Sequence, residues 1–281
     1  MKSVSDRQRI GTMLFYGTVR ELSDFLAGRG TNLHLDEAAL LLARIEFPGL
    51  EIDPFLQILD SFAAELAARL REWSDFVPMA NQYLFNELGF SGNEADYYNP
   101  ANSCLNEVLA SKTGIPITLS VVYLEIARRL SRPVFGIGLP GHFVVQYDDG
   151  LYSTYIDPFH GGALLDAAQC HDLAKTDGNP AALARVNTRQ IVARMINNLR
   201  GIYFARGAHR KTLQILNLLI DADPDSAEEY KQRGITYVQV EQTRAAKADF
   251  ERYLELAPDA PDRPQVEKQL TALKRWLVGM N

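Results

Sequence analysis

Cysteine is scarce in this sequence, because the 281 residues contain only Cys104 and Cys170. Two thiols this far apart in the chain form neither a disulfide framework nor a paired-thiol zinc motif. Long apolar runs are missing as well. No stretch approaches the roughly 18 apolar residues of a membrane-spanning helix, and charges interrupt the first residues before a signal-peptide core could form. We therefore expect a cytoplasmic protein that does not enter a membrane.

Positive charge is in the minority, since 29 Lys and Arg stand against 35 Asp and Glu, a net charge of −6. A protein that binds nucleic acid without regard to sequence needs a basic face for phosphate contacts. The balance therefore argues against a nucleic-acid partner. The remaining composition, 47% hydrophobic and 23% charged, is that of an ordinary globular protein.

The last third of the chain repeats with a period of 34 residues. Pro224 corresponds to Pro258 at this spacing, and Tyr203 corresponds to Tyr237. A period of 34 is that of the tetratricopeptide repeat, in which two antiparallel helices form a unit whose apolar face its neighbours cover. The region 186–281 is therefore predicted to hold two repeats and a capping helix. The predicted helices are 190–207, 210–222, 226–240, 243–257 and 265–280.

The first 90 residues have the periodicity of helices. The segments VRELSDFLAG and DEAALLLARIEF place apolar residues at spacings of three and four. No residues in this region suggest chemistry. We expect region 1–90 to be helical and to pack on the middle of the chain.

The middle region, 91–185, changes character along its length. It opens with a turn-rich segment, SGNEADYYNP, and continues with a short helix beginning at Cys104, which Asn102 or Ser103 could cap. A second helix has Pro116 in its first turn, where the missing N–H costs nothing. Residues 117–127 of that helix are apolar on nearly every side, a pattern typical of a central buried helix.

A β-hairpin follows, because the periodicity drops to two in VFGIGLPG, HFVVQY and LYSTYID. With Asp149 and Gly150 as a two-residue loop, the numbers of paired residues add up to 299, so that His142 faces Asp157. Residues that face each other across strands have Cβ atoms about 4.5–5.5 Å apart, so the imidazole and the carboxylate can meet. The alternative is a longer turn, because Asp148, which directly precedes this loop, also favours a turn.

A histidine held by an aspartate is two-thirds of a triad of nucleophile, base and orienting group. The carboxylate of Asp157 would fix the tautomer of His142 and stabilise its imidazolium form. The alternative interpretation is a structural ion pair or a hydrogen-bonded core histidine.

The order of these elements resembles the transglutaminase-like superfamily of papain-type folds, on the residues GIPITLSVVYLEIARRLSRP, PGHFVV and IDPF. With NPANSCLNEVL in front and tetratricopeptide repeats behind, the chain is similar to the SirB-one family of bacterial proteins. The resemblance implies an α+β, mostly helical fold, in which a central helix packs on a small antiparallel sheet.

The resemblance also implies site residues. In the superfamily a Cys opens the central helix, a His starts a following strand and an Asp ends the next one. His142 and Asp157 match the last two, but Pro116 stands at the position of the Cys. A His–Asp pair without a thiolate has nothing to activate. The G-I-P form is usual in the SirB-one family, which makes the departure a family trait.

Three other residues could supply a nucleophile. Cys104 lies twelve positions before Pro116 at the start of a helix, whose N-terminus would lower the pKa of the thiol. A buried small Cys is the commoner case. Thr118 and Ser120 are weaker candidates, because a hydroxyl there would need His142 as its base.

Metal binding is a further alternative, since His142, Asp157 and His160 are suitable ligands for a catalytic zinc ion. No helix-borne pair of histidines supports it, and His160 lies beside two glycines in a loop. The preferred prediction is therefore a site without metal or cofactor.

The function that the sequence favours is that of a degenerate, non-catalytic transglutaminase-like protein that binds a protein or peptide. The partner would contact a groove in the core, which the SGNEADYYNP segment could wall, and the tetratricopeptide region. The alternative is a thiol-dependent amide hydrolase or acyl transferase that uses Cys104 with His142 and Asp157.

Overall fold

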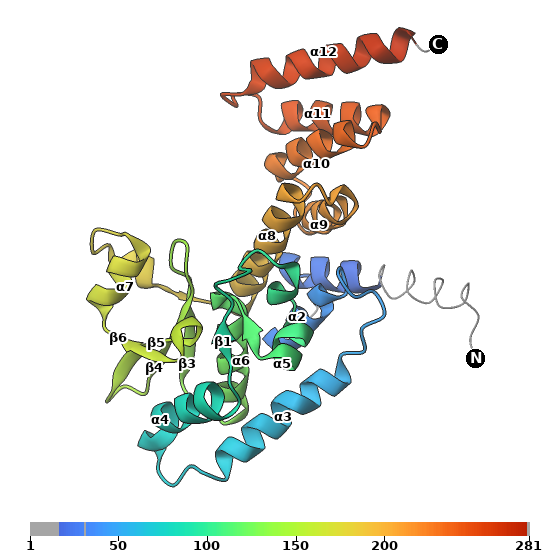
Figure 1. The fold of residues 1–281 in the computed structure, drawn as a ribbon. Helices are drawn as coiled ribbons and strands as arrows, with labels where there is room; N and C mark the ends of the chain where they lie inside the picture. The colour runs from blue at the N-terminus through green and yellow to red at the C-terminus, as the bar shows by residue number, and fades with distance from the viewer. Residues whose placement is uncertain (1–16, 31, 280–281) are drawn as a thin grey trace, which may run out of the picture. The chain divides into compact units, whose positions relative to one another are not determined.

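A five-stranded antiparallel sheet in the order β6-β5-β4-β3-β7 lies in the middle of the chain (Figure 1). The computed structural model describes residues 17–30 and 32–279. A second, two-stranded parallel sheet pairs β1 with β2. The strands are β1 (Ser91–Gly92), β2 (Thr113–Gly114), β3 (Val134–Ile137), β4 (Val144–Asp148), β5 (Ser153–Asp157), β6 (Ala163–Leu165) and β7 (Arg185–Val186).

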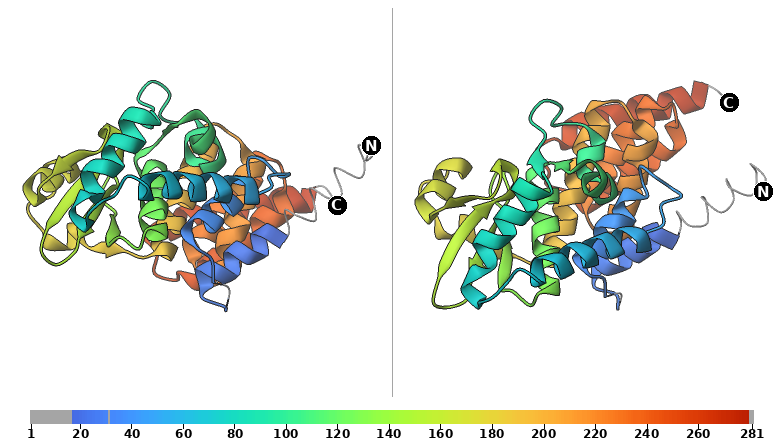
Figure 2. Two further views of the ribbon diagram at one scale, coloured as in Figure 1. Left: turned by 90° about the horizontal axis from the view of Figure 1, so that it is seen from below. Right: turned by 60° about the horizontal axis from the view of Figure 1, so that its bottom comes forward.

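The central helix α6 (Pro116–Arg129) confirms the prediction of a helix buried on nearly every side. Pro116 occupies its first turn as expected. The helix contacts β3 and β4 of the large sheet, and Figures 1 and 2 show it in green beside these strands. The other helices of this part are α2 (Leu35–Ala43), α3 (Asp53–Ala67), α4 (Phe76–Asn81), which continues as a π-helix over Gln82–Glu87, α5 (Leu105–Ser111) and α7 (Ala167–Ala174).

The large sheet is buried on both faces. Ile137 and Val144 pack in one cluster with Cys170 of α7. On the opposite face Tyr147 stacks on Phe76 of α4, with ring centroids 6.0 Å apart. This alternation along the strands is the period of two that the sequence displays.

The register of the hairpin differs from the prediction by two residues. Val145 pairs with Ile156 and Tyr147 pairs with Thr154, so the numbers of paired residues add up to 301 and the loop spans 149–152. The carboxylate of Asp149 explains the longer loop, because it accepts hydrogen bonds from the backbone N–H groups of Leu151 (2.9 Å) and Tyr152 (2.8 Å). A shift of two residues keeps every strand side chain on its predicted face.

The C-terminal helices confirm the predicted tetratricopeptide pattern to within two residues. Gly234 of α10 lets the ring of Phe250 in α11 approach so closely that an added Cβ would meet it at 2.7 Å. Arg233 and Asp249 join the same two helices through paired hydrogen bonds of 2.7 and 2.8 Å. The helices are α8 (Thr188–Ala205), α9 (His209–Ala222), α10 (Ala227–Gln239), α11 (Thr243–Leu256) and α12 (Arg263–Gly279).

The chain divides into two compact units, one formed by Asn32–Leu199 and one in which residues 17–30 join the residues after Leu199. The predicted boundaries at positions 90 and 185 both lie inside the first unit. Arg194 shows why, since its guanidinium on α8 donates to the carbonyl oxygen of Leu139. The helical residues 17–27 belong to the second unit, where Arg29 donates to the carbonyl oxygen of Asp221 at 2.8 Å.

Across residues 17–30 and 32–279, no helix combines the length and the apolar character that crossing a membrane requires.

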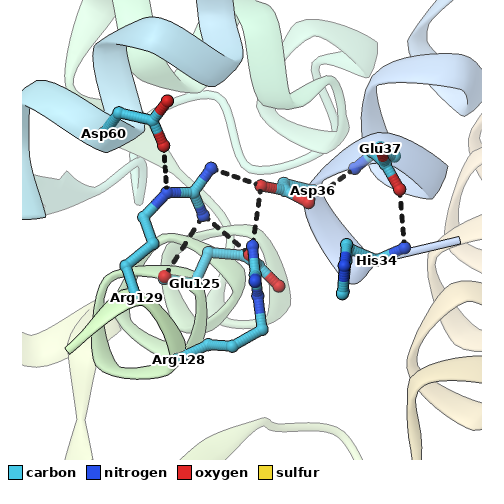
Figure 3. Close-up of polar contacts among 7 residues, drawn as sticks. All are labelled: His34, Asp36, Glu37, Asp60, Glu125, Arg128 and Arg129. Atoms are coloured by element: carbon cyan, nitrogen blue, oxygen red, sulfur yellow. Dashed lines mark hydrogen bonds and ion pairs between the residues drawn. The ribbon is translucent and has the colours of Figure 1, made fainter. Parts of the chain in front are cut away.

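A buried ion network ties α2 and α3 to the end of α6 (Figure 3). The Asp36 carboxylate accepts from Arg129 at 2.6 Å, and the Glu125 carboxylate accepts from the same guanidinium at 2.8 Å. Both carboxylates are only 2% exposed, whereas Asp60, which accepts from Arg129 Nε at 2.7 Å, is 65% exposed. Arg129 thus reaches one exposed and two buried acidic groups.

The pKa values of the two buried carboxyl groups, Asp36 and Glu125, shift in opposite directions. Burial raises the pKa of Asp36, but its hydrogen bond and charge contact with Arg129 outweigh that effect and hold the pKa below its ordinary value. Burial raises the pKa of Glu125, and the adjacent negative charge of Asp36 raises it further. Asp36 is therefore the partner whose charge stabilises the network.

We predict that Asp36→Ala lowers the free energy of unfolding by about 3–5 kcal/mol, because it leaves a nearly buried guanidinium short of a partner. Asp60→Ala removes an exposed partner of the same guanidinium and should cost at most about 1 kcal/mol. Urea unfolding of both variants at pH 7 measures the difference. Equal costs for the two substitutions would contradict a dominant role for the buried pair.

Candidate functional site

His142 lies in the turn between β3 and β4, two residues before β4 begins, and not on the strand as predicted. The turn is held from α8, because Arg194 Nη2 donates to the carbonyl oxygens of Leu139 (2.5 Å) and His142 (2.6 Å). The ring of Phe159 contacts the imidazole edge to face, with centroids 6.1 Å apart. Backbone anchoring and ring packing therefore fix the position of this imidazole, which is 11% exposed.

Asp157 ends β5 and caps the 3₁₀ turn Pro158–His160 (η4). Its Oδ1 accepts hydrogen bonds from the backbone N–H groups of Phe159 (3.0 Å) and His160 (3.4 Å). Its Oδ2 lies 2.8 Å from His142 Nε2. The carboxylate and the imidazole thus meet although the strand register does not place them opposite each other, because His142 precedes the strand and the turn bends it toward η4.

His160 contacts the same carboxylate oxygen, with its Nδ1 2.8 Å from Asp157 Oδ2. In the sequence His160 was a candidate only as a metal ligand, and this hydrogen bond was not predicted. The sequence spacing could have predicted it. Asp157 and His160 are three residues apart, and one 3₁₀ turn brings residues at this spacing onto the same side.

The pKa of Asp157 reflects these contacts. Burial raises the pKa of the carboxyl group, but hydrogen bonds from His142 and His160 lower it more, so the pKa lies below its ordinary value. The group is therefore ionised at neutral pH and can stabilise positive charge on either ring.

Pro116 opens the central helix and is buried. The order of the elements is thus a buried helix that begins with Pro116, then a turn that carries His142, then a strand that ends at Asp157. Such an arrangement can orient an imidazole as a general base, but Pro116 offers it no nucleophile.

Comparison with known families assigns both parts of the chain. A family profile described as the transglutaminase-like superfamily covers residues 53–197, and a tetratricopeptide-repeat profile covers residues 199–271. The chain belongs to the transglutaminase-like superfamily. The first profile ends and the second begins near Leu199, where the structure also divides the two units.

Individual relatives of this transglutaminase-like protein fall into two groups. A UPF0162 protein of Xylella fastidiosa is 34% identical over 255 residues, which cover 86% of this chain and 90% of the relative. A UPF0162 protein of Pseudomonas aeruginosa is 27% identical, with 85% and 90% covered. The human F-box only protein 21 is 31% identical over 166 residues, which cover 55% of this chain and 26% of that protein. No solved structure matches the chain.

The thiols of this transglutaminase-like protein are both buried. Cys104 is the N-cap residue of α5, a position that was predicted for Asn102 or Ser103, and its Sγ donates to the carbonyl oxygen of Pro100 at 3.4 Å. Cys170 of α7, for which no role was predicted, packs against the large sheet. Burial raises the pKa of Cys170 to about 11, and the nearby Asp157 carboxylate adds to the rise. Cys170 is therefore a protonated thiol at neutral pH.

The two hydroxyl candidates have different surroundings. Thr118 Oγ1 donates to the carbonyl oxygen of Asn102 at 2.7 Å and accepts from the backbone N–H of Ile115 at 3.1 Å. Thr118 is therefore part of the cap of α6. Ser120 Oγ is buried and has no hydrogen-bond partner within the described part of the chain.

A pocket of about 450 Å³ opens beside the carboxylate. Its lining residues come from β5, η4, β6 and α7, namely Asp157, His160, Ala163, Leu165, Gln169, Asp172 and Leu173. The ring nitrogens of His142 and His160 and the carboxylate of Asp157 lie within 4.8 Å of one another and could hold a metal ion.

We predict that Asp157→Ala lowers the free energy of unfolding by about 1–3 kcal/mol at pH 7, because the backbone and ring donors around the carboxylate lose their acceptor. Since the folded pKa of Asp157 is lowered, its contribution is present above the unfolded pKa near 4 and is lost as the pH falls through the folded value. The deficit should therefore shrink below about pH 4.

Urea unfolding between pH 3 and pH 7 in buffer with EDTA measures this dependence. Asp172→Ala, an exposed carboxylate at the rim of the same pocket, is the control and should cost almost nothing. A deficit for Asp157→Ala that stays constant over this range would mean that the residue acts through shape and not through charge.

Proposed function

We propose that this chain is a non-catalytic transglutaminase-like protein of the SirB-one family that binds a protein or peptide. The observation that carries the proposal is Pro116, which lies buried in the first turn of the central helix where the superfamily has its nucleophilic Cys. His142 and Asp157 would be the retained part of the catalytic site, and both lie in the core region 91–185.

The state of the thiols supports the loss of catalysis. A nucleophilic Cys needs access and a stabilised thiolate. Cys104 and Cys170 are both 0% exposed, and burial raises the pKa of Cys170 to about 11. Only two cysteines in the chain, both present as thiols, agree with the reducing cytoplasm that we propose as its compartment.

An aromatic surface supports peptide binding at the core. The ring of Tyr97 contacts Phe159 at 6.0 Å, and Phe159 in turn contacts His142. Tyr98, the next residue, packs edge to face on Tyr97 and is 70% exposed. The SGNEADYYNP segment therefore presents an exposed tyrosine at the end of an aromatic cluster that reaches the histidine, and tyrosine is enriched among residues that dominate binding energy.

The C-terminal unit supports a protein partner as well. Tetratricopeptide arrays use their stacked helices as extended binding surfaces. Trp276 of α12 is 52% exposed and lines a pocket of about 510 Å³ with residues 241–245 at the start of α11. This pocket offers one place for an apolar side chain of the partner.

We predict no turnover of glutamine or peptide amides by the wild-type protein. Iodoacetamide should modify neither thiol in the folded protein near neutral pH and both thiols in urea, because both are buried. Mass spectrometry of the alkylated protein and an ammonia-release assay check the two statements. Turnover that Cys104→Ala abolishes and Cys170→Ala preserves would replace this proposal with the thiol-enzyme alternative.

We predict that Tyr98→Ala weakens capture of the partner by about tenfold or more, as expected for an aromatic anchor. Tyr152→Ala is the matched control, because Tyr152 is also half-exposed (51%) but lies in the hairpin loop. Pull-downs from a lysate of the source organism with wild-type protein and both variants, quantified by mass spectrometry, measure the effect. Equal capture by all three proteins would exclude the Tyr98 surface as the binding site.

A further inference from the structure

Two imidazoles converge on one carboxylate oxygen in the core unit. His142 Nε2 and His160 Nδ1 each lie 2.8 Å from Asp157 Oδ2, and the two ring centroids are 5.7 Å apart. A retained His–Asp pair needs only one of these histidines. The second imidazole is 48% exposed, so burial does not oblige it to find a partner.

We propose that His142 Nε2, Asp157 Oδ2 and His160 Nδ1 form a binding site for a zinc ion. In a tetrahedral zinc site with bonds of about 2.0–2.2 Å, neighbouring ligand atoms lie about 3.4 Å apart. One ligand atom from each of the three residues lies within 4.8 Å of the other two. To admit the ion, both rings must rotate so that the two 2.8 Å contacts open by about half an ångström and the ring nitrogens also come to about 3.4 Å from each other.

The donor set selects the kind of ion. Two imidazole nitrogens with one carboxylate suit zinc and its transition-metal neighbours, whereas magnesium and calcium prefer sites built from oxygen atoms. In the metal-free protein the nitrogen that faces Asp157 donates its N–H to the carboxylate, so each ring must move this proton to its other nitrogen, through water, before the freed lone pair can bind the ion. No proton is released when both rings start neutral.

The surroundings already orient the ligands. Backbone N–H groups of Phe159 and His160 hold Asp157 Oδ1, so that Oδ2 is turned toward the rings. The ring of Phe159 lies edge to face against both His142 (6.1 Å) and His160 (5.1 Å). Such outer contacts are what keep metal ligands in place before the ion arrives.

One side of the site is open. Asp157 and His160 line the pocket of about 450 Å³, and Asp172 and Gln169 lie on its wall. With three protein ligands, a tetrahedral ion keeps a fourth position for water or a ligand from this pocket. The site does not depend on the proposed peptide binding, since Tyr98 is not among its ligands.

The test is a zinc titration of the tag-free full-length protein after dialysis against EDTA, in competition with a chromophoric chelator. His160→Ala removes an exposed ligand and leaves the His142–Asp157 contact in place. His171→Ala is the matched control, because His171 lies on α7 and its ring is engaged 2.9 Å from Thr176 Oγ1. Cobalt in place of zinc adds a visible absorption spectrum that reports tetrahedral coordination.

We expect one zinc ion per chain for the wild-type protein and for His171→Ala, with an affinity at least about 100-fold weaker for His160→Ala. Zinc should also raise the melting temperature of the first two proteins and not of His160→Ala. Absence of stoichiometric zinc in the wild-type protein, or equal affinity in His160→Ala, would overturn the site. Neither result bears on capture of the partner through Tyr98, so the two proposals fail separately.

Discussion

Burial of the helix α6 on nearly every side is the constraint on which the core depends. A helix with apolar residues all round must be covered all round, and the sheet, α2, α3 and α5 provide that cover. Its last turn carries Arg128 and Arg129, which satisfy the buried carboxylates of Asp36 and Glu125. The helix thus fixes where its neighbours lie, and its first turn fixes the position that Pro116 occupies.

Asp157 plays the corresponding part in the candidate site. One carboxylate caps a 3₁₀ turn with Oδ1 and meets two imidazoles with Oδ2. The same group therefore shapes the backbone and sets the electrostatics of the pocket beside it. Burial raises the pKa of the Cys170 thiol, and the negative charge of Asp157 adds to this effect, so the thiol stays protonated at neutral pH. A site built in this way favours binding of cations over generation of a thiolate.

The chain joins a transglutaminase-like region to tetratricopeptide helices, and the relatives in Xylella and Pseudomonas share nearly the whole length. F-box only protein 21 shares only part of it. That match covers 55% of this chain and 26% of the other protein, so most of F-box only protein 21 has no counterpart here.

Local periodicity was enough to predict most of the architecture. The period of 34, the all-round apolar helix and the alternation in the hairpin each depend on a few neighbouring residues, so the sequence alone predicted the central helix, the C-terminal helices, the three strands β3 to β5 and which strand face is buried, but not β1, β2, β6, β7 or α7. The presence of Pro116 in the first turn of the central helix is likewise a property of the sequence. Tertiary structure decided the rest. The hairpin register shifted because the Asp149 carboxylate stabilises a four-residue loop. His160 met Asp157 because the 3₁₀ turn folds back, and Cys170 is a core residue because α7 packs on the sheet. These contacts depend on how loops close and on which elements pack together, and no periodicity in the sequence encodes that geometry.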